Sequence, residues 1–101
     1  MRHRVASTDE VPLESLKRVV VDDHELCLAH AEDDGFYAID DICTHEHFLL
    51  SQGELWGMEV ECPAHGSRFD LRTGDVRFLP AVIPTNTYPV TVENGDVYVD
   101  V

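Results

Sequence analysis

Two short segments decide how this chain folds, Cys43-Thr44-His45 and Cys62-Pro63-Ala64-His65, and sixteen residues separate them. Each segment offers one thiolate and one imidazole, both of which are good ligands for transition metals. Four such ligands can hold a single tetrahedral zinc ion. They can also hold a cluster of two irons and two sulfides, with cysteines on one iron and histidines on the other. The sequence therefore predicts a metal centre held between two loops.

The distribution of the ligands favours the cluster over zinc. Zinc ribbons and fingers usually pair like ligands close together, as two cysteines or two histidines. Here each segment carries one cysteine and one histidine, so one iron can take a cysteine from each segment and the other iron a histidine from each. Two ferric ions, two sulfides and two thiolates then cancel in charge, which eases the uptake of an electron. A structural zinc module that serves protein interaction stays open as an alternative.

Short β-strands account for most of the remaining chain. Alternating and β-branched residues predict strands over residues 2–6, 16–21, 26–30, 36–39, 58–61, 67–69, 76–79, 87–92 and 97–101. In the third of these, Leu26 and Leu28 face one way, and Cys27 and Ala29 face the other. The only helical signal is a short turn around residues 14–17.

This pattern predicts an all-β fold, a small antiparallel sandwich or partly open barrel, with a cluster-binding subdomain inserted in it. Residues 1–40 and 81–101 form the base subdomain. Residues 41–80, which contain glycines at 53, 57, 66 and 74, form the inserted subdomain. At 101 residues, the whole chain is expected to be one domain.

Charge and cysteine content limit the partners and the compartment. Twenty acidic and seven basic residues give a formal charge of −13, which argues against binding to nucleic acid or to anionic membranes and favours a partner with a basic face. No apolar run approaches a membrane span, and the first residues do not resemble a signal peptide. The three cysteines are not spaced as a disulfide framework. A reduced, cytoplasmic protein is therefore expected.

The residues around the ligands resemble the Rieske iron–sulfur family. The quoted segments extend into Gly66-Ser67-Arg68-Phe69-Asp70, and the similarity continues through residues 36–42, 72–74, 87–90 and 92–95. The resemblance therefore covers nearly the whole chain. It implies one 2Fe-2S cluster with a ligand set of four residues and three more residues close to the cluster. The ligands are Cys43, His45, Cys62 and His65, and the neighbouring residues are Gly66, Ser67 and Pro80.

The resemblance also implies a role, that of a Rieske-type ferredoxin. Such a protein is not itself an enzyme. It carries single electrons from an NAD(P)H-dependent flavoprotein reductase to a terminal Rieske non-haem iron dioxygenase that acts on aromatic rings. We expect a monomer that binds both partners transiently and electrostatically. A small Rieske subunit of a nitrite reductase is the alternative within the same family.

Three positions separate this chain from the Rieske proteins of respiratory complexes. Those proteins have an additional cysteine in each cluster loop, where this chain has Phe48 and Ala64, so their disulfide is absent here. They also have a tyrosine that donates to a cysteine sulfur, where this chain has Phe69. Because that donor is missing, we expect a potential near the low end of the roughly −150 to +300 mV range of such centres. His47 is not expected to be a ligand, since four others are present.

Overall fold

Strands and short turns make up the whole chain. The computed structural model describes residues 1–101, and it contains eleven strands, two 3-10 helices and no α-helix. The strands are β1 (Arg2–Ser7), β2 (Ser15–Val21), β3 (His24–His30), β4 (Phe36–Asp40), β5 (Glu54–Trp56), β6 (Glu59–Glu61), β7 (Arg68–Asp70), β8 (Val76–Phe78), β9 (Thr87–Tyr88), β10 (Val90–Glu93) and β11 (Asp96–Asp100). The 3-10 helices are η1 (Thr8–Glu10) and η2 (Leu50–Gln52). No segment forms a helix long and apolar enough to cross a bilayer.

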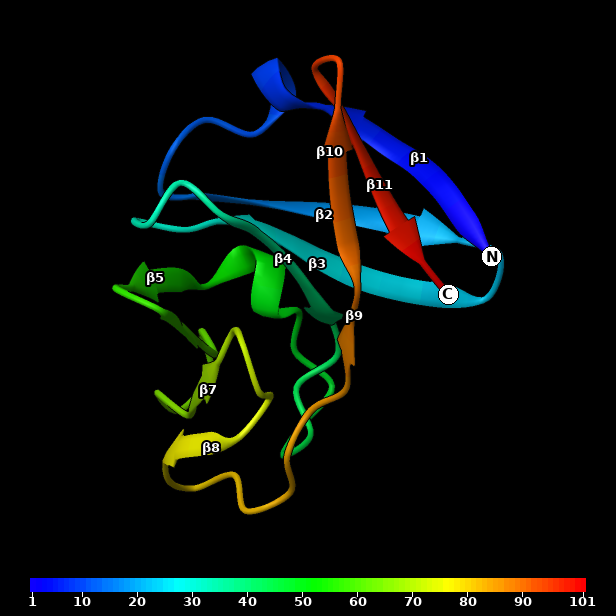
Figure 1. The fold of residues 1–101 in the computed structure, drawn as a ribbon. Coiled ribbons are helices and arrows are strands. Elements are labelled where there is room, and N and C mark those ends of the chain that lie inside the picture. Colours follow the sequence, from blue (N-terminus) through cyan, green and yellow to red (C-terminus); the bar gives the residue numbers. More distant parts are fainter.

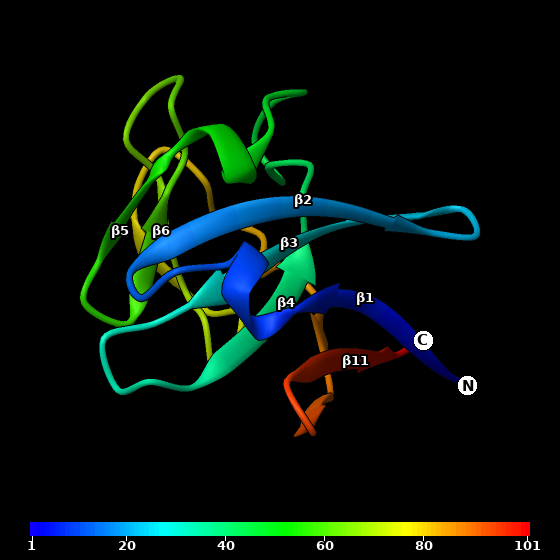
Figure 2. The same cartoon turned by 90° about the horizontal axis from the view of Figure 1, so that it is seen from above.

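The strands form three antiparallel sheets, with the orders β1-β11-β10, β2-β3-β4-β9 and β5-β6-β7-β8 (Figure 1). Viewed from above, the sheet that contains β2 and β3 lies between β1 and β11 on one side and β5 and β6 on the other (Figure 2). None of the sheets closes into a barrel. The all-β prediction is therefore confirmed, in its open, layered form.

Strand β3 contributes to two separate cores because both of its faces are buried. Leu26 and Leu28 pack in a core with Val97 and Val99 of β11, among other residues. Cys27 and Ala29 face the opposite side, as the alternation predicted, and pack in a second core. That second core contains Ile39, Cys43, Leu50, Val60, Cys62, Phe69 and Leu71. The predicted cysteine ligands therefore lie in the core between the central sheet and the sheet of β5 to β8.

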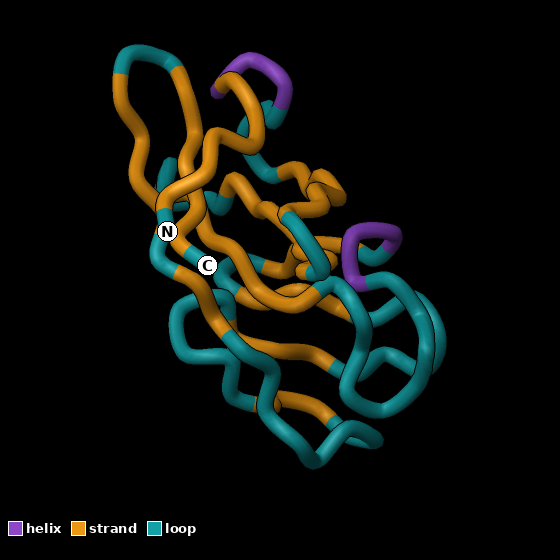
Figure 3. Tube along the Cα trace, turned by 90° about the vertical axis from the view of Figure 1, so that its right-hand side faces the viewer, coloured by secondary structure: helices purple, strands orange, loops and turns teal.

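The two termini lie side by side (Figure 3). The amino group of Met1 donates to the carbonyl oxygen of Val101 at 2.7 Å and to a carboxylate oxygen of Asp100 at 2.7 Å. Strands β1 and β11 pair in this region, with a register shift between Arg4 and Ala6. The sheet that contains this pair, β1-β11-β10, includes none of the residues between β4 and β9.

Two predictions about the base were wrong in detail. The turn predicted at 14–17 is absent, because Glu14 has a φ of 60° and β2 starts directly after it. The short helical turn lies earlier, in η1, where the Ser7 N–H donates to Glu10 Oε1 at 2.7 Å. The single strand predicted at 87–92 is two strands in different sheets. Pro89 separates them, since proline has no N–H to donate to a ladder.

The inserted sheet also differs from the prediction at its ends. The short strand β5 was not predicted, because three residues are too few to show an alternation. Strand β8 ends at Phe78 and not at Leu79. The chain then runs through residues 79–86 back to β9 in the central sheet.

Candidate metal centre

The first ligand-bearing loop comprises residues 43–48 and follows β4 closely. Its ends are joined because the Cys43 N–H donates to the Phe48 carbonyl at 2.9 Å. Outside this hydrogen bond, Ile42 and Leu49 form an isolated antiparallel bridge. The loop therefore starts at a buried cysteine and carries His45 on its outward part.

The second loop comprises residues 62–67 and connects β6 to β7. Here the Cys62 N–H donates to the Ser67 carbonyl at 2.7 Å. Gly66 donates to the Cys62 carbonyl at 3.3 Å and has a φ of 79°, a conformation that residues with a side chain rarely adopt. Both loops thus span six residues, begin with the cysteine and are closed by the N–H of that cysteine.

The four predicted ligands differ in exposure, since the cysteines are buried and the histidines are open to solvent. Cys43 and Cys62 are each only 3% exposed and lie in one hydrophobic core. The side chains of His45 and His65 are 35% and 58% exposed. Their rings are neighbours, with centroids 6.0 Å apart and planes at 73°. The loops therefore bring the cysteines together on the inside and the histidines together toward the solvent.

Several groups around Cys62 raise or lower the pKa of its thiol. Burial raises the pKa of the Cys62 thiol, the backbone N–H of Ala64 lowers it, and the adjacent Cys43 raises it. A backbone N–H from His65 also lowers it. A metal ion would remove the cost of ionising the Cys62 thiol. No group of three or more Cys, His, Asp or Glu side chains lies close enough together to hold a single metal ion.

Asp41 anchors the first loop from inside the protein. Its carboxylate is fully buried and accepts hydrogen bonds from Arg18 Nη1 at 2.8 Å, from Ser51 Oγ at 2.8 Å and from the Ser51 N–H at 2.7 Å. The Leu50 N–H donates to the Asp41 carbonyl at 2.7 Å. All polar atoms of the buried group are thus satisfied, which fixes the chain two residues before Cys43. The sequence shows no signal for this role except the proximity to Cys43.

Residues 79–84 form a strap over both loops. The Ala81 N–H donates to Ser67 Oγ at 3.0 Å, and Thr44 Oγ1 donates to the Ile83 carbonyl at 2.6 Å. Ser67 was predicted to lie close to the cluster. Its oxygen accepts from Ala81, and the hydroxyl hydrogen remains available for a second bond. Pro80 is exposed, and the buried residue of the strap is Ala81.

One residue at the centre was not predicted from the sequence. Glu46 Oε1 lies 3.2 Å from His65 Nε2 and 3.5 Å from His45 Nε2. Glu46 follows His45 directly, so its closeness to that ligand could have been predicted from the sequence. Its contact with the second ligand depends on how the two loops fold together.

The donor set and its arrangement fit a binuclear cluster. Two thiols lie together inside, two imidazoles lie together outside, and backbone N–H groups of Ala64 and His65 are directed at a cysteine sulfur. Hydrogen bonds of this kind to sulfur stabilise iron–sulfur centres.

Comparison with known proteins supports the same assignment. A family model described as the Rieske [2Fe-2S] domain matches residues 1–89, which indicates one Rieske-type 2Fe-2S cluster. The ferredoxin component of the p-cumate 2,3-dioxygenase system of Pseudomonas putida is 40% identical over 98 residues, covering 96% of this chain and 83% of that protein. The 3-phenylpropionate/cinnamic acid dioxygenase ferredoxin subunit of Escherichia coli (strain K12) is 48% identical over 66 residues, covering 64% of this chain and 62% of that protein.

Solved structures give the same picture. The ferredoxin of carbazole 1,9a-dioxygenase from Nocardioides aromaticivorans IC177 superposes with a TM-score of 0.92 at 34% identity, covering 98% of this chain and 96% of that one. A ferredoxin chain in a complex of reduced oxygenase and oxidized ferredoxin of carbazole 1,9a-dioxygenase has a TM-score of 0.90 at 34% identity, covering 97% and 91%. A putative nitrite reductase small subunit has a TM-score of 0.87 at 20% identity, covering 100% and 99%, and so shows a shared fold alone.

Proposed function

Because the chain belongs to the Rieske [2Fe-2S] domain family, we propose that it is the ferredoxin of a ring-hydroxylating dioxygenase system. In this role it takes single electrons from an NAD(P)H-dependent flavoprotein reductase and delivers them to a terminal Rieske non-haem iron oxygenase. It transfers electrons and catalyses no reaction of its own. The observation that carries the proposal is the pair of six-residue loops, each with a buried cysteine and an outward histidine.

We assign the cluster ligands by their position. Cys43 and Cys62 would hold the inner iron, and His45 and His65 the outer iron. The cluster supplies a site that gains and loses one electron without a bound substrate. The chain's own contribution is to exclude water from the cysteine side through Phe69 and Leu50 and to leave the histidine side open to a partner. The histidine edges are then the natural route for electrons.

The strap gives the partner an apolar surface beside the histidines. Leu79, Val82 and Ile83 are 73%, 74% and 60% exposed, and the strap that carries them is hydrogen-bonded to both ligand loops. Phe48, at the end of the first loop, is 44% exposed. Exposed apolar side chains that gather on one segment mark contact surfaces. The formal charge of −13 would add attraction over longer distances toward a basic partner.

The same proposal includes two subdomains and a cytoplasmic location. Residues 41–80 hold the cluster, and residues 1–40 with 81–101 form the base that supports it. A cytoplasmic location suits three free cysteines, all of them buried. A monomer suits a carrier that must leave one partner to meet the next.

The proposal is tested by reconstituting electron transfer. Purified, cluster-containing protein is added to an aromatic-ring oxygenase and an NADH-dependent ferredoxin reductase, and hydroxylated product is measured with and without it. We expect product only when all three proteins are present. A stable enzyme complex that co-purifies with this chain and reduces nitrite would favour the nitrite reductase subunit. A colourless protein that contains zinc would contradict an electron carrier of either kind.

A further inference from the structure

One carboxylate contacts both of the proposed histidine ligands. Glu46 Oε1 is 3.2 Å from His65 Nε2 and 3.5 Å from His45 Nε2, although the two histidines come from different loops. The Glu46 side chain is 37% exposed, so it is partly shielded from water. The position follows from the first loop, in which the Phe48 N–H donates to the Glu46 carbonyl at 2.8 Å and turns the chain back.

This contact determines which nitrogen of each imidazole ring is free to bind a metal. An imidazole has two nitrogens, and one of them can donate while the other binds a metal. Because Nε2 of His45 and Nε2 of His65 both face Glu46, Nδ1 of each ring would be the nitrogen available to iron. A single carboxylate oxygen thus lies beside both imidazoles.

The same contact acts on the electron. The negative charge of the carboxylate would lie close to iron held by the histidines, and a negative charge opposes the arrival of an electron. This effect favours the oxidised form of the centre over the reduced form.

We infer that Glu46 lowers the reduction potential of the centre by holding a negative charge beside Nε2 of both histidine ligands. The inference rests on the proposed function, since it requires His45 and His65 to bind iron. Reduction adds one electron to the centre, and no bond to Glu46 is broken. Glu46 is thus a tuning residue, and it makes the ferredoxin a stronger reductant for its oxygenase.

The test is a potentiometric titration of the cluster-containing protein at one fixed pH, with a chemical reductant and mediator dyes. Glu46→Gln keeps the size and an acceptor oxygen but removes the charge. We expect the ratio of reduced to oxidised protein at a given applied potential to rise about tenfold, which corresponds to about 59 mV for a one-electron couple. Glu46→Asp keeps the charge on a shorter side chain and should give a midpoint between those of wild type and Glu46→Gln.

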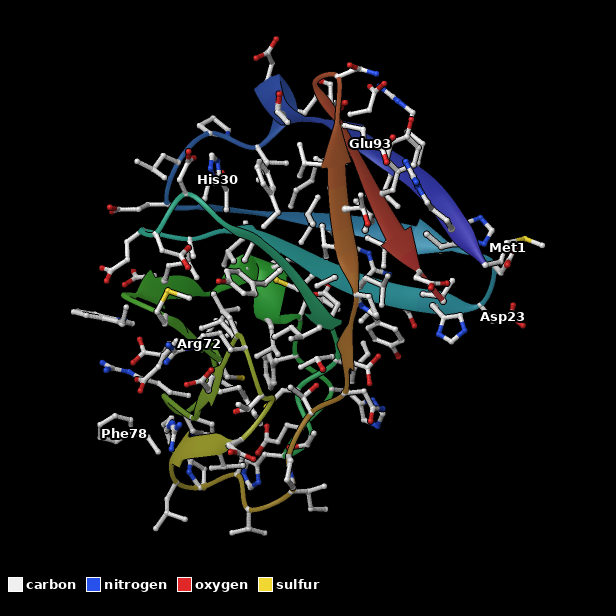
Figure 4. All side chains as sticks on the ribbon, in the orientation of Figure 1. Met1, Asp23, His30, Arg72, Phe78 and Glu93 are labelled. Carbon is white, nitrogen blue, oxygen red and sulfur yellow. The ribbon has the colours of Figure 1, made fainter.

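The matched control is Asp23→Asn, which changes the net charge by the same amount. Asp23 is exposed in the β2–β3 turn and lies at the side of the molecule away from the ligand loops (Figure 4). This variant should shift the ratio less than threefold. The reduced-state EPR spectrum should change in Glu46→Gln and stay unchanged in Asp23→Asn, since only Glu46 acts on the histidine-bound iron.

Each result has a distinct meaning. Equal midpoints for Glu46→Gln and Asp23→Asn would overturn the inference, as would the loss of the cluster from both Glu46 variants, because Glu46 would then be required for assembly and not for tuning. A wild-type protein without a Rieske spectrum would instead refute the proposed function. A wild-type Rieske spectrum with a midpoint unchanged in Glu46→Gln would refute only the role of Glu46.

Discussion

At the scale of single residues, the four proposed ligands differ in exposure in the way their chemistry requires. The cysteine sulfurs are buried away from water, and the histidine rings are open to solvent. The third cysteine, Cys27, lies in the same core and is fully buried. Burial raises its pKa far above the usual range of a thiol, so it is an inert apolar residue.

The three cysteines provide an internal comparison. Replacing Cys43 by Ser should abolish the visible absorption of the cluster, because a hydroxyl is a poor ligand for iron compared with a thiolate. Replacing Cys27 by Ala should keep the cluster and cost only a small cavity, about 1 kcal/mol. Iron content and absorption per protein measure both effects. Full retention of iron in Cys43→Ser, or its loss in Cys27→Ala, would show that the ligand set is wrong.

At the scale of elements, the predictions succeeded where a pattern is local. The alternation of β3, the ligand segments and the all-β class follow from neighbouring residues. The strap over Ser67, the anchor at Asp41 and the contact of Glu46 with His65 join residues far apart in the chain. No pattern among neighbouring residues in the sequence predicts such contacts. The division of β9 from β10 could have been predicted, since Pro89 lies between them.

The two hydrogen bonds of the strap should differ in their effect on stability. Ser67→Ala leaves the Ala81 N–H buried without an acceptor, which costs about 1–3 kcal/mol and should lower Tm by roughly 5–15 °C. Thr44→Val removes a donor from the carbonyl of Ile83, an exposed residue, so water can replace it and the change should stay within about 0.5 kcal/mol. Thermal unfolding of both cluster-containing variants, at one scan rate, makes the comparison. Equal Tm values would mean that the strap is not held through Ser67.

The β7–β8 hairpin should be sensitive to acid through Asp70. Burial raises the pKa of this carboxyl, but hydrogen bonds from Arg72 and Arg77 outweigh burial and lower the pKa to about 2 from a usual 3.8. Its stabilisation is therefore complete above about pH 4 and is lost as the pH falls through about 2.

The variant Asp70→Asn should consequently be less stable than wild type by about 1–2 kcal/mol at pH 6, and by less at pH 3. Asp75→Asn, at an exposed position in the same hairpin, serves as the control and should change little. Thermal unfolding of the three proteins at both pH values measures the differences. A gap between Asp70→Asn and wild type that stays constant between the two pH values would argue against the charge of Asp70 as the cause.

At the scale of the whole molecule, the three sheets form layers, and the ligand loops and the strap lie at one end of the inserted sheet (Figure 1). Acidic residues outnumber basic ones by 20 to 7, yet the strap beside the histidines is apolar. Long-range charge and short-range apolar contact can therefore act at different stages of an encounter. Under the proposed function, charge would increase the rate of collision, and the apolar strap would orient the histidines toward the partner.

A charge placed on the strap should weaken docking without changing the centre. Val82→Asp introduces a carboxylate at a position that is 74% exposed, and we expect kcat/KM for electron delivery to the oxygenase to fall about tenfold. Val20→Asp makes the same change on β2, at 57% exposure, and should have little effect. Steady-state oxygenase turnover at varied ferredoxin concentration, with the midpoint potential as a check, separates docking from redox effects. Equal losses in the two variants would place docking elsewhere.

The central claim is that one cluster is held by two cysteines and two histidines, with the histidines on one iron. Pulsed EPR of the reduced protein, grown with ¹⁵N-labelled histidine, tests this claim most directly. We predict one unpaired spin per chain, coupled strongly to two ¹⁵N nuclei, and the same coupling in His47→Ala. A reduced protein without ¹⁵N coupling, or one without an EPR signal and with bound zinc, would contradict it.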